Sequence, residues 1–194
     1  MSKFEFVFSL FGLLMGFSLV EVLGGFVKTL KARQHVRLGW LTPLLGLYVM
    51  LDLTSFWDNA WEVRDAVPAN YGILAYGLFL FGAYYFAASL VFPDKTEEWP
   101  DLDLYYFEHK RQILGAIAAV NVVVLVNLVL VNSAGRLDPP ALAIQALNFT
   151  MLGIAWWSRR PRVNIAALAG LCALYLIIAL LLLFLPLILA LLSR

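Results

Sequence analysis

Two acidic residues, Glu21 and Asp52, stand inside long apolar stretches of the sequence, and they are the residues best placed to do chemistry. A charged side chain at bilayer depth costs roughly 2.5–3.5 kcal/mol on insertion scales, so its presence needs a compensating reason. Carboxylates at such depth often belong to an ion path or a proton relay. The alternative is a carboxylate that only bonds a neighbouring helix and contributes to packing.

Asp52 belongs to a polar stripe whose members recur at the i+3 and i+4 spacing of one helix face. The stripe comprises Tyr48, Asp52, Ser55 and Asn59, and it runs toward a segment that contains Asp58, Glu62 and Asp65 with the aromatic residues Trp57 and Trp61. This pattern predicts a path that leads a cation or proton inward. The alternative is a buried network that orients helices, with the tryptophans as ordinary interfacial anchors.

Glu21 shares a second helix face with Ser18 and Gly25 through the same spacings. It precedes Lys28 by seven residues, which places it roughly 10 Å inside the basic edge of its span at 1.5 Å per residue. We expect this face to turn toward other helices and to be a second candidate for the ion path. A carboxylate that extends toward the water, or that bonds a neighbour for packing, is the alternative.

Neutral polar residues in later spans are secondary candidates for lining a path, namely Asn121, Asn127, Gln145 and Asn148. Interhelical hydrogen bonds from such groups contribute only about 0.6 kcal/mol on average, so packing alone also explains them. Gly12 and Gly16 form a small-xxx-small pair, a pattern that favours close helix packing.

The elements that position these residues follow from the composition, which is 62% hydrophobic and only 14% charged. Soluble domains are about 45–50% apolar and about 25% charged, so the excess predicts an integral membrane protein. Roughly 20 apolar residues span a bilayer as a helix. Six stretches qualify, and they predict one all-α transmembrane domain over residues 1–194 with spans at 4–27, 39–57, 69–92, 113–131, 141–157 and 165–192.

The distribution of Lys and Arg predicts the orientation, because loops rich in these residues stay in the cytoplasm. Ten of the 14 lie in the connections after the first, third and fifth spans. Both termini are therefore expected on the non-cytoplasmic side, in a cell membrane that we interpret as a bacterial inner membrane. In the cytoplasmic loop 93–112, Asp101 should cap a short interfacial helix before the fourth span, with Trp99 and Tyr105 at headgroup level. A docking site for a cytoplasmic or membrane partner is the alternative for this loop.

Several function classes are disfavoured. A net charge of +1 gives no basic face for nucleic acid. One cysteine and two histidines give no cluster that would hold a metal or a membrane haem, so we expect no cofactor. The leading hypothesis is a small, homo-oligomeric channel or transporter among membrane lipids, which passes a cation or proton along the buried acids. The alternatives are a non-catalytic accessory subunit of a membrane complex and an intramembrane enzyme acting on lipid or quinone.

Overall fold

The chain is a bundle of helices, as the composition predicts. The computed structural model describes residues 2–62, 64–65, 67–131 and 139–192. These residues contain no strand; the helices are α1 (Lys3–Ala32), α2 (Leu41–Glu62), α3 (Tyr71–Ser89), η1 (Thr96–Glu98), α4 (Leu102–Val131), α5 (Pro139–Trp157) and α6 (Pro161–Leu192). The predicted all-α class is confirmed.

Four helices are long and apolar enough to cross a membrane. They are Lys3–Ala32, Tyr71–Ser89, the Leu102–Asn127 part of α4 and the Pro161–Leu185 part of α6. The helices α2 and α5 are not among them. The reason is visible in their sequences, because α2 contains Asp52 and Asp58 and α5 contains Gln145 and Asn148. Length and composition therefore establish four candidate spans, and six spans stay a prediction.

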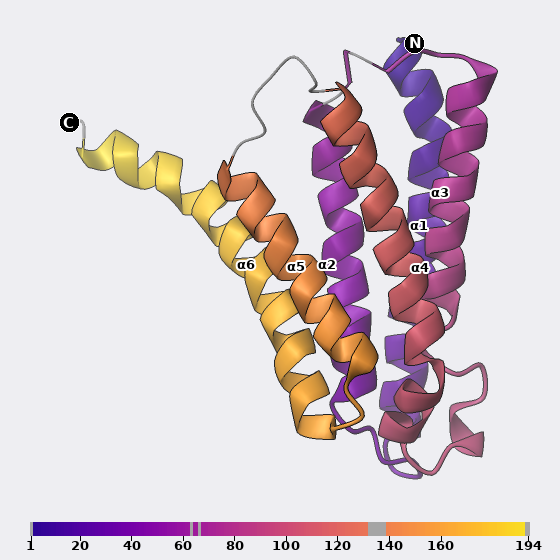
Figure 1. Cartoon of the computed structure of the whole chain (residues 1–194). Coiled ribbons are helices and arrows are strands. Elements are labelled where there is room, and N and C mark those ends of the chain that lie inside the picture. Colours follow the sequence, from indigo (N-terminus) through magenta and orange to yellow (C-terminus); the bar gives the residue numbers. More distant parts are fainter. Residues whose placement is uncertain (1, 63, 66, 132–138, 193–194) are drawn as a thin grey trace.

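The α-helices run roughly side by side, with both chain ends at one end of the bundle (Figure 1). α1 packs on α3 and α3 on α4, while α2 packs on α6 and α5 also packs on α6. The helix α2 lies in the middle and buries Leu45, Tyr48, Val49 and Leu53. The α5–α6 hairpin leans away from the other helices toward the end that carries the termini.

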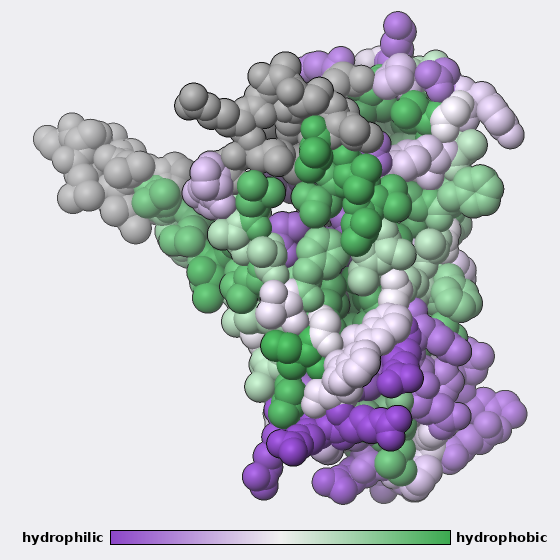
Figure 2. Space-filling model, viewed as in Figure 1, coloured by the Kyte–Doolittle hydropathy of each residue, from purple (hydrophilic) through white to green (hydrophobic). Residues whose placement is uncertain are grey.

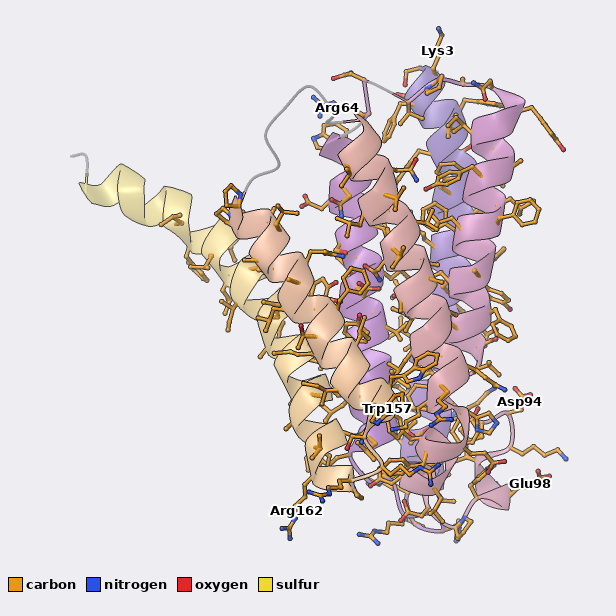
Figure 3. All side chains as sticks on the ribbon, in the orientation of Figure 1. Lys3, Arg64, Asp94, Glu98, Trp157 and Arg162 are labelled. Atoms are coloured by element: carbon orange, nitrogen blue, oxygen red, sulfur yellow. The ribbon has the colours of Figure 1, made fainter. Side chains whose placement is uncertain are left out.

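Charged and apolar side chains occupy separate zones along the bundle. Lys3 and Arg64 lie at one end, and Asp94, Glu98 and Arg162 lie at the other (Figure 3). Between these ends the visible surface is largely hydrophobic, and the lower end in the same view is strongly hydrophilic (Figure 2). Many large apolar side chains of α1, α3 and α6 are exposed. An apolar belt of this extent is suited to contact with lipid tails.

Asp103 links the start of α4 to the α1–α2 connection at the hydrophilic end of the bundle. Its carboxylate accepts hydrogen bonds from the backbone N–H groups of Trp40 and Leu41 at 3.1 and 2.9 Å, so it caps the start of α2. Gly39 adopts a left-handed φ of 61°, and a Cβ there would lie 2.1 Å from this carboxylate. Only glycine fits both the backbone angle and the space.

The start of α4 partly differs from the expectation. Asp101 caps it as predicted, because its carboxylate accepts from the N–H of Asp103 at 2.8 Å. The expected separate interfacial helix, however, is the first part of one uninterrupted helix of 30 residues. No glycine or proline lies between Leu102 and Leu114, so nothing in the sequence breaks the helix before the apolar part begins.

Candidate functional site

Asp52 is completely buried at the point where α2, α3, α4 and α6 meet. Its carboxylate accepts hydrogen bonds from the Tyr84 hydroxyl at 2.9 Å and from the Tyr175 hydroxyl at 2.5 Å. The side-chain N–H of Asn121 donates to it at 3.2 Å. One acid on α2 thus gathers a polar group from each of three other helices.

The three donors solvate the acid without neutralising it. None of the ion pairs within the described residues includes Asp52, so no cation lies against this carboxylate. Hydroxyl and amide dipoles therefore take the place of water around a group that would carry a full charge when ionised. A buried carboxylate with no cationic partner is an uncommon arrangement for purely structural packing.

The Tyr84 hydroxyl has two acceptors within reach. It lies 2.9 Å from Asp52 and also 2.9 Å from the backbone carbonyl oxygen of Val49. A tyrosine hydroxyl has one proton to donate and can also accept. It can donate to the ionised carboxylate, or it can donate to Val49 and accept from the protonated acid. The site therefore offers hydrogen-bond partners to both protonation states of Asp52.

A second layer of polar groups adjoins the carboxylate. The amide of Asn148 on α5 donates to the Tyr175 hydroxyl at 3.2 Å, and the Tyr48 ring lies 6.1 Å from the Tyr175 ring between centroids. Tyr48 and Asn148 are both buried. The Tyr48 hydroxyl and the carbonyl oxygen of Asn148 have no hydrogen-bond partner among the described residues. All six α-helices except α1 thus contribute a side chain to this cluster.

The rest of the predicted stripe leads outward along α2. The Ser55 hydroxyl donates to the backbone oxygen of Asp52 at 2.7 Å, and the Asn59 amide donates to the backbone oxygen of Ser55 at 2.8 Å. Ser55 is half-buried and Asn59 is exposed. The stripe therefore runs from the surface to the buried acid, although its outer members bond their own helix.

The aromatic residues beside the outer end of α2 lie partly on the surface. Trp57 packs edge-on against Phe8 of α1 at 5.9 Å between ring centroids. Trp61 carries the Arg64 guanidinium over its ring at 4.4 Å from the centroid. Both indole rings keep exposed area, as interfacial residues do.

Glu21 does not join Asp52. Its side chain is exposed on α1, and its nearest hydrogen-bonding group is the Tyr85 hydroxyl at 3.4 Å. Ser18 is buried and donates to the backbone oxygen of Leu14 at 3.0 Å. Of this predicted face, Ser18 and Gly25 turn inward and the carboxylate turns outward. The two acids therefore belong to separate surroundings.

The secondary candidates divide in the same way. Asn121 and Asn148 lie in the cluster around Asp52, whereas Asn127 bonds the Tyr76 hydroxyl at 2.9 Å near the bundle surface. Gln145 is half-buried on α5, three residues before Asn148.

The two predicted packing glycines differ in their surroundings. A Cβ on Gly12 would lie 3.9 Å from Trp57, which is ordinary contact, and one on Gly16 would meet nothing within 4 Å. The closest approach lies elsewhere, at Gly77 of α3, where a Cβ would lie 1.8 Å from the Phe11 ring of α1.

The aromatic residues of the connection 93–112 pack against one another. Tyr105 is buried, donates its hydroxyl proton to the Leu90 backbone oxygen at 2.9 Å and stacks on His109 at 4.2 Å. Trp99 packs edge-on against Tyr105 at 5.0 Å. The Tyr105 ring is thus an internal anchor of this connection and is not presented on its surface.

Sequence reasoning missed a second buried polar cluster at the hydrophilic end. The Lys110 ammonium group donates to the backbone oxygens of Ala155 and Ser158 and to the Asn164 side chain, to which the Tyr106 hydroxyl also donates. It therefore caps the carboxyl end of α5, where the helix dipole favours a cation. The available signal was spacing, because Tyr106 and Lys110 lie on the α4 face that continues into buried apolar residues.

The site gives no sign of a resident metal centre: in the parts of the chain with assigned positions, no three His, Cys, Asp or Glu side chains lie together. Comparison of the chain with protein-family models, with curated proteins and with solved structures returns no match.

Proposed function

We propose that this chain is a small membrane transporter that moves protons, with Asp52 as the group that binds and releases them. The observation that carries the proposal is a fully buried carboxylate whose hydroxyl partner Tyr84 has a second acceptor, Val49, at the same distance. Such a site accommodates both the ionised and the protonated acid. Ionisable residues within membrane spans commonly mark proton relays and ion paths.

A proton fits this site better than a metal cation. Na⁺ and the divalent ions need several oxygen ligands with lone pairs directed at one point. Around Asp52 the neighbours direct O–H and N–H protons at the carboxylate instead. These three donors occupy most of the roughly four lone-pair sites of the carboxylate, and binding a proton does not require the cavity that a metal ion with its other ligands would need.

Polar side chains lead from Asp52 toward one end of the bundle, and buried apolar side chains separate it from the other end. On α4 the buried residues Ile113, Leu114 and Ile117 separate Lys110 from Asn121. On α6 the residues from Ala167 to Cys172 separate Asn164 from Tyr175 in the same way. In each helix the two polar residues are 11 positions apart, which is about 16 Å of helix. Proton passage therefore requires the helices to move, which favours a carrier or a gated pathway over an open pore.

The proposal includes the membrane topology. It has six spans, with α2 and α5 crossing inside the bundle, and the connections rich in Lys and Arg on the cytoplasmic side of a bacterial inner membrane. A central helix with a polar stripe is compatible with spanning when its polar groups face other helices. Both termini then lie on the non-cytoplasmic side, and the outer end of the Asp52 stripe opens to that same side.

The proposal is tested in proteoliposomes that contain the purified chain and a pH-sensitive dye. An imposed pH gradient, balanced electrically by valinomycin and K⁺, should collapse faster than in empty vesicles. Gradients of Na⁺ or K⁺ at equal pH on both sides should produce no comparable flux. Collapse at the rate of empty vesicles under every gradient would contradict the proposal, and Na⁺ flux without proton flux would contradict its assignment of the cargo.

The exposed position of Glu21 favours a second candidate, a subunit that assembles with another membrane protein or with a second copy. Among the described residues, the Glu21 carboxylate on the outer face of α1 has one hydrogen-bonding contact, to the Tyr85 hydroxyl at 3.4 Å. A polar neighbour on another molecule would solvate it better than lipid does. Crosslinking in native membranes from Val20→Cys, which is exposed beside Glu21 and keeps its carboxylate, should then give one defined product, and a purely monomeric pattern would count against assembly.

A further inference from the structure

Two buried polar atoms beside the Asp52 cluster have no partner among the described side chains and backbone groups. They are the hydroxyl oxygen of Tyr48 and the carbonyl oxygen of Asn148. Tyr48 is 0% exposed and Asn148 is 2% exposed. A hydroxyl and an amide oxygen removed from water without a hydrogen bond are both destabilising, so a native structure normally supplies a partner.

The two atoms belong to the same small region. The Asn148 amide donates to Tyr175, whose ring lies next to that of Tyr48. The region is bounded by α2, α5 and α6, and Tyr175 connects it directly to Asp52 at 2.5 Å.

We propose that one water molecule binds between Tyr48, Asn148 and Tyr175. Tyr48 donates its hydroxyl proton to the water, and the water donates to the free carbonyl oxygen of Asn148. The second water proton has the Tyr175 oxygen as its acceptor, because that oxygen gives its own proton to Asp52 and accepts one hydrogen bond from Asn148, which leaves one of its two lone pairs. Buried waters typically make about three hydrogen bonds to groups that otherwise lack them.

Water is favoured over a cation by the groups present. The site offers one hydroxyl, which can donate or accept, and one amide oxygen, which accepts; one water bonds both, whereas a metal ion needs more oxygen ligands than these two. Within the described part of the chain the adjoining carboxylate is Asp52, which already accepts hydrogen bonds from Tyr84, Tyr175 and Asn121.

Such a water would complete a relay, and this part of the inference rests on the proposed function. A hydronium ion at the water position transfers one proton to the Tyr175 oxygen while Tyr175 transfers its phenolic proton to the Asp52 carboxylate. One O–H bond breaks and one forms at Tyr175, which stays neutral. The products are a neutral water and a protonated Asp52.

The test is the substitution Tyr48→Phe, which removes one hydroxyl and keeps the ring. If water binds the hydroxyl, the variant loses a hydrogen bond and its unfolding midpoint in detergent falls by about 2–4 °C. If the hydroxyl is truly unpartnered, its removal relieves a penalty and the midpoint rises. Tyr71→Phe is the matched control, since Tyr71 is 84% exposed, and its midpoint should not change.

Infrared spectroscopy of the full chain in lipid supplies the direct readout. A buried water gives an O–H stretching band that shifts when H₂¹⁸O replaces H₂O, and this band should disappear in Tyr48→Phe. The absence of the band in the parent chain, its survival in Tyr48→Phe, or a raised midpoint would each overturn the inference. If Tyr48→Phe does not fold, Asn148→Leu should remove the same band and serves in its place.

The outcome is separable from that of the transport assay. A water band with no proton flux leaves the binding site in place and removes the proposed function. Proton flux with no water band removes only the site and its part in the relay.

Discussion

Removal of the Tyr84 hydroxyl is the sharpest structural test of the Asp52 cluster. The substitution Tyr84→Phe keeps the ring and its edge-on contact with Phe56 at 5.5 Å. It deletes the bonds of 2.9 Å to Asp52 and Val49. The polar cluster then holds its carboxylate with two donors instead of three.

The expected loss can be set between two limits. A hydrogen bond to a charged group contributes about 1.5–3 kcal/mol in soluble proteins. Interhelical bonds in membranes average about 0.6 kcal/mol and reach about 1.7 kcal/mol. Because the Tyr84 hydroxyl is completely buried and meets a carboxylate, we expect the upper part of the membrane range, about 1.5 kcal/mol. That lowers the ratio of folded to unfolded protein about tenfold.

The neighbouring tyrosine provides the control. Tyr85 lies on the exposed side of α3, 38% exposed, with a contact of 3.4 Å to Glu21. Tyr85→Phe should cost about 0.5 kcal/mol or less because exposed polar pairs contribute little. The free energy of unfolding of both variants is measured by titrating mild-detergent micelles with a denaturing detergent. Equal losses for Tyr84→Phe and Tyr85→Phe would refute the reasoning that the Tyr84 hydroxyl is a buried hydrogen-bond donor to the Asp52 carboxylate.

Two further matched pairs test the packing around the site. Lys110→Met should lower the free energy of unfolding by about 2–3 kcal/mol, because the end of α5 loses a buried, charged donor. Lys95→Met loses one exposed ion pair and should lower it by less than about 1 kcal/mol. Comparable losses in the two lysine variants would contradict this. Gly77→Ala should cost about 1–3 kcal/mol, because its Cβ would overlap the Phe11 ring. Gly82→Ala meets nothing within 4 Å and should stabilise by about 0.5–1 kcal/mol; the unfolding titration used for the tyrosine variants checks both signs.

The sequence specified which face of α2 would be polar, but not what would meet it. The i+3 and i+4 spacing placed Tyr48, Asp52 and Ser55 on one face, and the structure brings Tyr48 and Asp52 into the buried cluster. Tyr84 is one of four tyrosines in the apolar helix α3, and Tyr175 stands in the apolar helix α6, so neither is marked by a periodic polar pattern. Helical periodicity indicates the face of one helix, whereas the pairing of faces depends on packing among all of them.

The same limit explains why the structure places Lys110 and Glu21 in surroundings that the sequence did not predict. Lys110 follows a loop rich in charge, so it counted toward orientation, yet α4 begins early enough to carry it into the bundle under the end of α5. Glu21 was expected to turn inward with Ser18. Ser18 and Gly25 of that face are buried, whereas Glu21 lies at the edge of the face and its side chain is exposed.

The most direct test of the central claim is the rate of proton flux through Asp52→Asn compared with Asp58→Asn in proteoliposomes. Both substitutions remove one carboxylate from α2, but Asp52 is completely buried and Asp58 is exposed. The proposed mechanism predicts that flux falls to the level of empty vesicles in Asp52→Asn and stays close to the parent rate in Asp58→Asn. Parent-like flux through folded Asp52→Asn would contradict it.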